Sequence, residues 1–400
     1  MPVSPSSPRV AILSAARSPI GRYLGSLRGI PAPLLGAHVA RAAIQRAGLE
    51  PSAVEEVLVG HGIAAGVGQN PARQVGRHAG VPDTAGATTV HMVCGSGMKA
   101  VHLAVAEIRS GAAAIVLAGG MESMSRAPYL VPGEVRWGTH FGDRTLEDAM
   151  QVDSLRDAYD EHELMGRTGE RVARKFGLRR EEVDAYAVRS NRRAADAATR
   201  GLFAEELVPV PAGLVAGSPG LAADECVRPG TSMESLARLP PAFEPGGVLT
   251  AGNSSKLSDG AAMLVLASER EVSRRGLAPI GWIHSTAVSG VAPADVMEAP
   301  IPTVREHLAA AGWAVSSLDG VEHNEAYASA SLAVQRAFGF PDEIFNPRGG
   351  AVALGHPIGA SGARILVTLL FALRQTRGRR GLATLCMGGG NGLSTLVELA

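Results

Sequence analysis

The chain has 400 residues, of which 46 % are hydrophobic and 19 % are charged, a balance typical of globular proteins that excludes a disordered chain. Lysine and arginine together number 38, as do aspartate and glutamate, so the formal net charge is zero. With aromatic residues at only 4 %, this neutrality argues against nucleic acid and anionic membranes as partners. At roughly 100–200 residues per domain, the length predicts two or three domains or one large α/β assembly.

The three cysteines, Cys94, Cys226 and Cys386, lie far apart and form no CxxC pair. This spacing disfavours a structural zinc site and a disulfide framework, and free thiols suit a reducing compartment, so we expect a cytoplasmic protein. The segment Met1–Pro8 has no basic stretch followed by an apolar one, and we interpret it as a frayed tail. The apolar run Ile365–Leu373 is too short to span a bilayer.

Strand-like and helix-like segments alternate from the start of the chain. Val10–Ser14 is typical of a short buried strand, Pro33–Ala47 has apolar residues at helical spacing, and Val54–Val59 is again strand-like. This alternation predicts an α/β fold with a largely parallel sheet covered by helices.

A weak internal repeat relates the two ends of the chain. Each copy has a Gly-rich turn, a helix-like run and a strand, in this order. The first copy comprises 94–97, Met98–Arg109 and Ala113–Gly120, and the second 359–362, Ala363–Gln375 and Gly381–Gly390. The repeat favours two duplicated α/β halves over chance similarity between two βα units.

Residues 126–255, between the copies, have a different character and are predicted to be an inserted loop domain. Pro/Gly-rich stretches flank charged helical segments, and residues 165–200 contain 10 Arg or Lys against 5 Asp or Glu. This basic surplus either meets an anionic part of a substrate or forms a solvated helix face.

Several motifs are missing, which lowers the weight of the corresponding functions. There is no phosphate-binding GxxxxGK[ST] and no GxSxG, and Gly95 and Gly97 are not part of a dinucleotide fingerprint. His162 and Glu163 lack the second histidine of a zinc protease, because Gly166 stands in its place.

Four polar positions could carry chemistry. Cys94 lies at a Gly-rich turn just before a predicted helix, whose N-terminal dipole would lower the thiol pKa; the alternative is an inert buried thiol. His356, between Gly355 and Pro357, is either a base, an oxyanion donor or a structural loop residue. Cys386 ends a strand before three glycines, where free N–H groups can hold an oxyanion. Asn324 either orients a water or caps a turn.

These residues lie in motifs that resemble those of the thiolases, in the same order and over nearly the whole chain. The motifs are Val93–Gly97, His323–Ala326, Gly355–Pro357 and Cys386–Gly390, with further similar segments at Ala118–Ser125 and Thr250–Ser255. The resemblance implies an α/β fold of five layers, αβαβα, from two duplicated halves with an inserted loop domain that binds coenzyme A.

The resemblance also implies roles for the catalytic residues. Cys94 would carry the acyl group, and His356 would activate it and donate to the thioester oxyanion, which a water held by Asn324 would complete. Cys386 would move the proton at the α-carbon of the second acyl-CoA, as a thiolate of low pKa. The N–H groups of Cys94 and Gly388 would form a second oxyanion hole.

For coenzyme A, the resemblance implies Arg228 and Ser235 at the nucleotide end, Ser255 and Met165 at the pantetheine arm, and Phe243 at the tunnel wall. No permanently bound cofactor or metal is expected, since coenzyme A thioesters are the substrates.

Three positions depart from the usual thiolase pattern. Leu164 stands where many acetyl-specific members have His, Tyr327 where Phe is usual, and His91 where Asn is usual. We expect Leu164 and Tyr327 to border the acyl pocket, and His91 to serve packing rather than proton transfer. No role is assigned to Cys226, which we expect to be a free surface thiol.

The sequence thus predicts an acyltransferase that condenses two acetyl-CoA reversibly to acetoacetyl-CoA and CoA with ping-pong kinetics. The alternatives are a degradative 3-ketoacyl-CoA thiolase of broader chain length and, more remotely, a non-catalytic lipid-binding paralogue. A ketoacyl synthase is disfavoured by the second cysteine, Cys386. The stretch Pro128–Gly142 resembles a tetramerisation loop, so a homotetramer is expected over a dimer. The predicted division is 1–127 with 256–281, 128–255, and 282–400.

Overall fold

The computed structural model describes residues 8–138, 141–159 and 162–400, so Met1–Ser7 of the predicted tail lie outside the described residues. The strands are β1 (Val10–Arg17), β2 (Gly21–Arg22), β3 (Glu56–His61), β4 (Gly86–Val90), β5 (Ile115–Ser123), β6 (Tyr129–Leu130), β7 (Glu147–Asp148), β8 (Ser258–Ser268), β9 (Gly281–Gly290), β10 (Gly320–His323), β11 (Arg380–Met387) and β12 (Asn391–Leu399). The helices are α1 (Ala32–Arg46), α2 (Pro71–Ala79), α3 (Ser96–Ser110), α4 (Met165–Lys175), α5 (Arg180–Thr199), α6 (Met233–Ala237), α7 (Glu269–Arg275), α8 (Pro300–Ala311), α9 (Ala328–Phe338), α10 (Ala351–Leu354) and α11 (Ile358–Thr376).

The strand order confirms the predicted duplication. The first half has the order β1-β8-β5-β3-β4, and the second has β9-β12-β11-β10, next to which Phe345 forms a parallel bridge with Val321. From the first strand outward, the pairings in both halves are antiparallel, antiparallel, parallel and parallel. The two halves join where β1 pairs with β9 over Val10–Ile12.

The expectation of a largely parallel sheet was wrong. Among the described strand pairs of the large sheet only β3–β4, β3–β5 and β10–β11 are parallel, with the Val321–Phe345 bridge at its edge. The reason is the position of the last strand of each half. In the first half β8 lies between β1 and β5, and in the second half β12 lies between β9 and β11. In the second half β11 and β12 are joined by the short turn 388–390, which forces them to be antiparallel.

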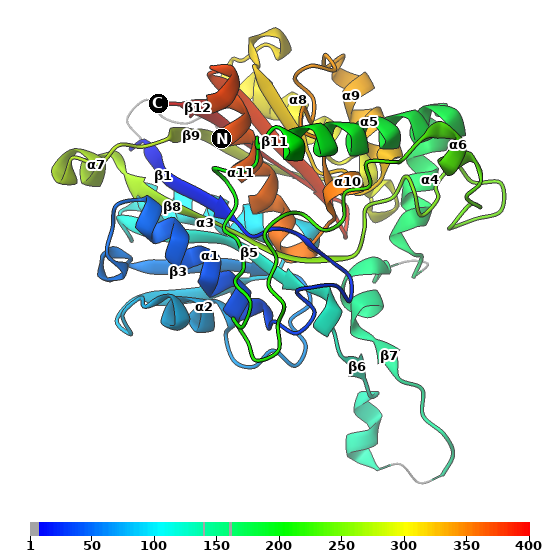
Figure 1. Cartoon of the computed structure of the whole chain (residues 1–400), viewed down its shortest axis with the longest axis horizontal. Coiled ribbons are helices and arrows are strands. Elements are labelled where there is room, and N and C mark those ends of the chain that lie inside the picture. Colours follow the sequence, from blue (N-terminus) through cyan, green and yellow to red (C-terminus); the bar gives the residue numbers. More distant parts are fainter. Residues whose placement is uncertain (1–7, 139–140, 160–161) are drawn as a thin grey trace.

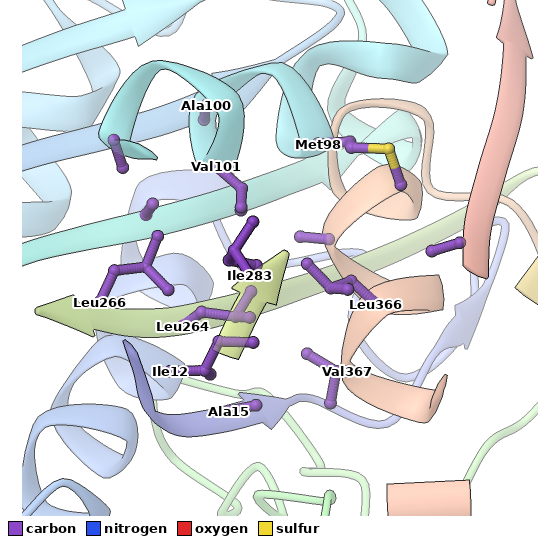
Figure 2. Packing of buried hydrophobic residues seen from close by; sticks show 14 of the residues in the cluster. Ile12, Ala15, Met98, Ala100, Val101, Leu264, Leu266, Ile283, Leu366 and Val367 are labelled. Carbon is purple, nitrogen blue, oxygen red and sulfur yellow. The ribbon is translucent and has the colours of Figure 1, made fainter. Parts of the chain in front are cut away.

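The elements form five layers, with α3 and α11 between the two halves of the sheet (Figure 1). Side chains from both helices and from both half-sheets build this central core; Figure 2 shows Ile12, Met98, Val101, Leu264 and Leu366 packed together. Helices α1 and α2 cover the outer face of the first half, and α8 and α9 that of the second. Every residue of α11 from Ile358 to Leu373 is buried; the helix has the length and composition of a membrane span, yet it is a core helix.

Two glycines allow the halves to interlock beneath the Cys94 turn. A Cβ at Gly120 would lie 2.1 Å from the carbonyl oxygen of Gly359, and one at Gly97 would lie 2.8 Å from the same atom. Any side chain at these positions would therefore separate the end of β5 and the start of α3 from the start of α11.

The inserted segment has two parts. A narrow extension with β6 and β7 projects from the body (Figure 1), whereas α4, α5 and α6 pack against the second half. Much of the predicted basic surplus is paired with acidic residues, as in the ion pairs Arg174–Glu244, Lys175–Glu298 and Arg180–Asp184. The division of the chain into 1–127 with 256–281, 128–255 and 282–400 stays a prediction.

Candidate active site

Cys94 lies in a tight turn between β4 and α3. The preceding residue, Val93, has a φ of 45°, a left-handed conformation that is costly for a β-branched residue. The Ser96 hydroxyl stabilises the turn, since it accepts the N–H of Met92 at 2.8 Å and donates to the carbonyl of Val93 at 2.7 Å. The turn thereby presents the thiol in a partly buried position.

His356 faces this thiol, with its Nε2 3.3 Å from the Cys94 Sγ. Its Nδ1 lies 2.5 Å from the Ser361 Oγ, and the single hydroxyl proton of Ser361 is donated to the carbonyl of Pro357 at 2.9 Å. Ser361 can therefore only accept from the ring, which places the imidazole proton on Nδ1. The unprotonated Nε2 is then free to accept the thiol proton of Cys94.

The protonation states differ from the sequence prediction. Burial raises the pKa of Cys94 to about 12, with the nearby Cys386 as a further cause. Burial also raises the pKa of Cys386 to about 12. The prediction of low-pKa thiolates was wrong because the loss of hydration outweighs the donors at the turn. By contrast, burial and then the charge of Arg364 lower the pKa of His356 to about 4, so this base is neutral near pH 7.

Cys386, at the end of β11, opens into the same pocket as Cys94. Its sulfur lies 3.7 Å from the sulfur of Met297. The N–H groups of Gly388 and of Cys94 itself are directed at the Cys94 sulfur and act to lower its pKa, though less than burial raises it. The pocket is lined by Cys94, Ser154, Leu155, Met165, Ser255, Val296, Met297, Ala326, Tyr327, His356, Ile358, Cys386, Met387 and Gly388.

Asn324 follows β10 directly and reaches the same histidine. Its Nδ2 lies 3.4 Å from the His356 Nε2, and its backbone N–H donates to the carbonyl of Thr384 at 3.1 Å. Its buried Oδ1 has no hydrogen-bond partner within the described part of the chain. The side chain can thus hold a polar group beside His356.

The residues predicted to bind coenzyme A are only partly brought together. Met165 and Ser255 line the pocket, whereas Phe243 stands behind it with its ring edge-to-face on Tyr327 at 5.7 Å. Arg228 and Ser235 lie outside the pocket lining: Ser235 accepts within the cap of α6, and the Arg228 N–H donates to the Asn191 Oδ1.

The three positions that depart from the thiolase pattern also differ in where they lie. Tyr327 lines the pocket as expected, but Leu164 is exposed and does not. His91 is exposed, and its Nε2 lies 2.9 Å from the carbonyl oxygen of Gly62, so it makes a hydrogen bond rather than packing in a core. The expectation of a surface thiol was wrong for Cys226, which is buried 3.8 Å from the Ser258 Oγ.

Sequence reasoning assigned no role to Glu122 or to Ser361. The fully buried Glu122 carboxylate accepts the N–H groups of Gly62 and Gly359, each at 2.9 Å, and lies 3.0 Å from the Nε2 of His61. A charged residue inside the apolar strand 115–123 was the available signal for Glu122. Ser361 had no comparable signal, because its partner is set by the turn before α11.

Two family models cover this chain: the thiolase N-terminal domain matches residues 10–270, and the thiolase C-terminal domain matches residues 277–399. The chain belongs to the thiolase family. Its thiolase relatives include the acetyl-CoA acetyltransferase of Chromobacterium violaceum, 46 % identical over 97 % of this chain and 99 % of that protein. A relative named likewise from Cupriavidus necator is also 46 % identical, over the same shares of both chains.

Solved thiolase structures agree with this assignment. The acetyl-CoA acetyltransferase of Bacillus anthracis is 37 % identical with a TM-score of 0.96, covering 99 % of this chain and 100 % of that one. Human mitochondrial 3-ketoacyl-CoA thiolase, solved in complex with CoA, is 36 % identical with a TM-score of 0.94, covering 98 % of both chains. The five-layered thiolase fold predicted from the motifs is thereby confirmed.

Proposed function

We propose that this thiolase is an acetyl-CoA C-acetyltransferase, which reversibly condenses two acetyl-CoA to acetoacetyl-CoA and CoA through an acyl-Cys94 intermediate. The observation that carries the proposal is the approach of the His356 Nε2 to the Cys94 Sγ at 3.3 Å, with Cys386 lining the same pocket. The relatives named acetyl-CoA acetyltransferase, 46 % identical over nearly the full chain, support it.

In the first half-reaction Cys94 becomes acylated. The unprotonated Nε2 of His356 takes the thiol proton as the sulfur attacks the thioester carbonyl. The resulting imidazolium and the Asn324 side chain stabilise the oxyanion. When the tetrahedral intermediate collapses, CoA leaves as a thiolate and takes the proton of Cys386, which leaves Cys386 as a thiolate and His356 protonated.

In the second half-reaction a carbon–carbon bond forms. The Cys386 thiolate removes a proton from the α-carbon of the second acetyl-CoA, and the carbanion attacks the acyl carbonyl on Cys94. The N–H groups of Cys94 and Gly388 hold the second oxyanion. Collapse releases acetoacetyl-CoA and a Cys94 thiolate, which regains its proton from His356, so both cysteines and the imidazole return to their starting states.

The raised pKa of Cys386 is compatible with this role. A thiolate whose conjugate acid has a pKa of about 12 is a stronger base than an ordinary thiolate. Because burial keeps the Cys386 thiol protonated in the resting enzyme, its thiolate forms during turnover, when the departing CoA takes the proton. Proton abstraction is then confined to the acylated enzyme.

We further propose coenzyme A thioesters as the substrates, with Met165 and Ser255 on the pantetheine arm, Phe243 behind Tyr327, and Arg228 and Ser235 at the nucleotide end. The positions of Met165 and Ser255 in the pocket lining support this assignment. The CoA complex of the human relative supports the substrate class.

A short acyl group is favoured over the alternative of a 3-ketoacyl-CoA thiolase with broader chain length. Three large side chains, those of Met165, Met297 and Tyr327, line the pocket around the two cysteines. Phe243 packs edge-to-face on the Tyr327 ring, and a Cβ at Gly169 would lie 3.0 Å from that ring. A longer acyl chain would have to displace one of these side chains.

We also propose a cytoplasmic homotetramer that contacts neither nucleic acid nor membrane. The neutral net charge supports the absence of anionic partners. Exposed apolar residues on the β6–β7 extension, among them Trp137 and Phe141, support a further subunit contact there. Of the predicted loop Pro128–Gly142, residues 139–140 lie outside the described residues.

Thiolysis of acetoacetyl-CoA with free CoA tests the function, followed as loss of the ketoacyl-CoA. We expect rapid cleavage that Cys94→Ala abolishes, while 3-ketohexanoyl-CoA is cleaved at least about tenfold more slowly. Cleavage of the longer substrate at an equal rate would contradict the acetyl assignment. No cleavage of either substrate by the wild-type protein would contradict the proposed activity and leave the non-catalytic paralogue.

A further inference from the structure

The segment that carries His356 is attached to residues 256–258, where β8 begins. The backbone N–H of His356 donates to the carbonyl of Lys256 at 2.9 Å, and the Ser258 hydroxyl donates to the same carbonyl at 2.7 Å. Gly355 has a φ of 105°, and a Cβ there would lie 2.2 Å from the Ser258 Oγ. The His356 loop therefore lies directly on the backbone of Lys256 and Ser258.

The side chain of Lys256 holds the other side of the same loop. Its Nζ donates to the carbonyls of Val352 at 2.5 Å and Ala353 at 3.3 Å, in the last turn of α10. Helix α10 ends at Leu354, two residues before His356. Carbonyls in the last turn of a helix have no partner within the helix, and a cation there interacts favourably with the helix dipole.

The opposite end of α10 carries the matching charge. The carboxylate of Glu325 accepts the N–H of Val352 at 3.1 Å and also bonds the hydroxyls of Tyr186 and Ser190. A carboxylate at the start and an ammonium at the end fix this short helix along its axis. Since α10 has only four residues, its own backbone bonds contribute little to its stability.

Lysine is rare in this chain, yet one stands at position 256. Of the 38 basic residues only Lys99, Lys175 and Lys256 are lysines. A compact ammonium on a flexible stem can donate to two adjacent carbonyls, whereas a planar guanidinium needs more room. Burial, followed by the influence of Arg228, lowers the pKa of Lys256 to about 8, while Cys226 and Glu325 act in the opposite direction.

We propose that Lys256 is a positioning residue of the reaction: it fixes α10 and the following loop, so that the His356 Nε2 stays within reach of the Cys94 thiol. Lys256 touches neither reacting sulfur, so its effect passes entirely through His356. The inference rests on the proposed function for its kinetic part. A displacement of about 1 Å in a catalytic group can lower a rate about 100-fold.

Lys256→Met tests this, since it keeps the length of the stem and removes the ammonium. We expect kcat for thiolysis of acetoacetyl-CoA to fall at least about tenfold with KM changed less than about threefold. The rate of Cys94 alkylation by iodoacetamide, corrected with Cys94→Ala, should fall in parallel. Lys256→Arg, which returns charge and donors, should recover part of both rates. Arg275→Met serves as a control, because it removes a surface cation paired with Glu271.

Alkylation separates failure of this inference from failure of the proposed function, because it needs no turnover. Folded Lys256→Met with wild-type kcat and alkylation would overturn the proposal. A loss of unfolding free energy with unchanged Cys94 reactivity would likewise overturn it, since a merely structural residue behaves in that way. If Lys256→Met does not fold, Lys256→Gln, which keeps a shorter donor, is measured by the same criteria.

Discussion

Glu122, on β5 of the first half, accepts the backbone N–H of Gly359, at the start of α11 in the second half, at 2.9 Å. The same carboxylate accepts the N–H of Gly62 and lies beside His61, so one buried anion ties two strands of the first half to the helix behind His356. These donors lower the pKa of Glu122 against the effect of its burial. The position of the two halves relative to each other is thus fixed by a buried charge as well as by apolar packing.

Glu122→Ala should therefore destabilise the fold strongly. The substitution leaves buried N–H groups and a buried histidine without their acceptor, and loss of one partner of a buried pair typically costs about 3–5 kcal/mol. Unfolding in urea measures the change in free energy. Glu269→Ala, which removes a half-exposed carboxylate paired with Arg9, is the matched control and should change little. Equal stability of the two variants would contradict the bridging role.

Ser361→Ala should impair catalysis more than folding. Ser361 accepts the Nδ1 proton of His356, and without it the imidazole can adopt the other tautomer, which presents a proton rather than a lone pair to Cys94. We expect kcat for thiolysis to fall about 10–100-fold with a smaller change in KM. Ser361→Thr, which keeps the hydroxyl, should retain more activity than Ser361→Ala. The idea fails if both variants match the wild type.

How far the sequence predicts this site depends on the range of each interaction. The apolar periodicity and the Gly-rich turns are local signals, and they place the helices and strands around Cys94 and Cys386 within a few residues. The sheet directions were mispredicted because the position of β8 and β12 between other strands depends on contacts distant in sequence. The pKa values of the two thiols were mispredicted for the same reason, since a helix N-terminus can be read locally but desolvation cannot.

Lys256 and Glu122 show the same limit. Both are ordinary charged residues in the sequence, and their importance comes from which backbone groups they meet in the folded chain. Arg228 and Ser235 are the opposite example: the sequence singles them out, but they do not line the pocket of the two cysteines. The resemblance places them at the nucleotide end of coenzyme A, and their position outside the pocket of the two cysteines follows from where α6 and its flanking loop lie.

Acid should destabilise the protein through its buried neutral histidines. Burial lowers the pKa of His102 and His323 to about 3 and of His307 and His356 to about 4. The unfolded chain binds these protons below about pH 6.5, whereas the native state does not, so stability falls as the pH decreases from there toward 4. Glu322 and Asp259, whose pKa values burial raises to about 8 and about 6, contribute the opposite slope.

Thermal unfolding at pH 7.5, 6 and 5 measures this slope. We expect a melting temperature that decreases with each step, and a flatter profile for His102→Gln, which keeps a partner for the Thr395 hydroxyl but does not titrate. A melting temperature that rises on acidification would show that the buried carboxyls of Glu322 and Asp259 outweigh the histidines.

Tyr327→Ala should broaden the substrate range. The ring lines the pocket between the two cysteines and Phe243, so its removal leaves space beside the acyl group. We expect the ratio of kcat/KM for 3-ketohexanoyl-CoA over acetoacetyl-CoA to rise about tenfold, which corresponds to about 1.4 kcal/mol of differential binding. Leu164→Ala is the control, because Leu164 is exposed outside the pocket and its loss should leave the ratio unchanged. A rise for Leu164→Ala instead would place the acyl group elsewhere.

The β6–β7 extension should decide the assembly. Trp137 is 80 % exposed and Phe141 96 %, on an extension that projects from the body of the molecule. Apolar side chains exposed to this extent are unfavourable unless another subunit covers them.

Substitution of both residues by Ser should therefore reduce the mass measured by light scattering from that of a tetramer to that of a dimer. Glu134→Ser, in the same turn, should leave the mass unchanged. Because the pocket residues come from other parts of the chain, thiolysis by the dimer should continue; an unchanged mass for the double variant would exclude the extension as the tetramer contact.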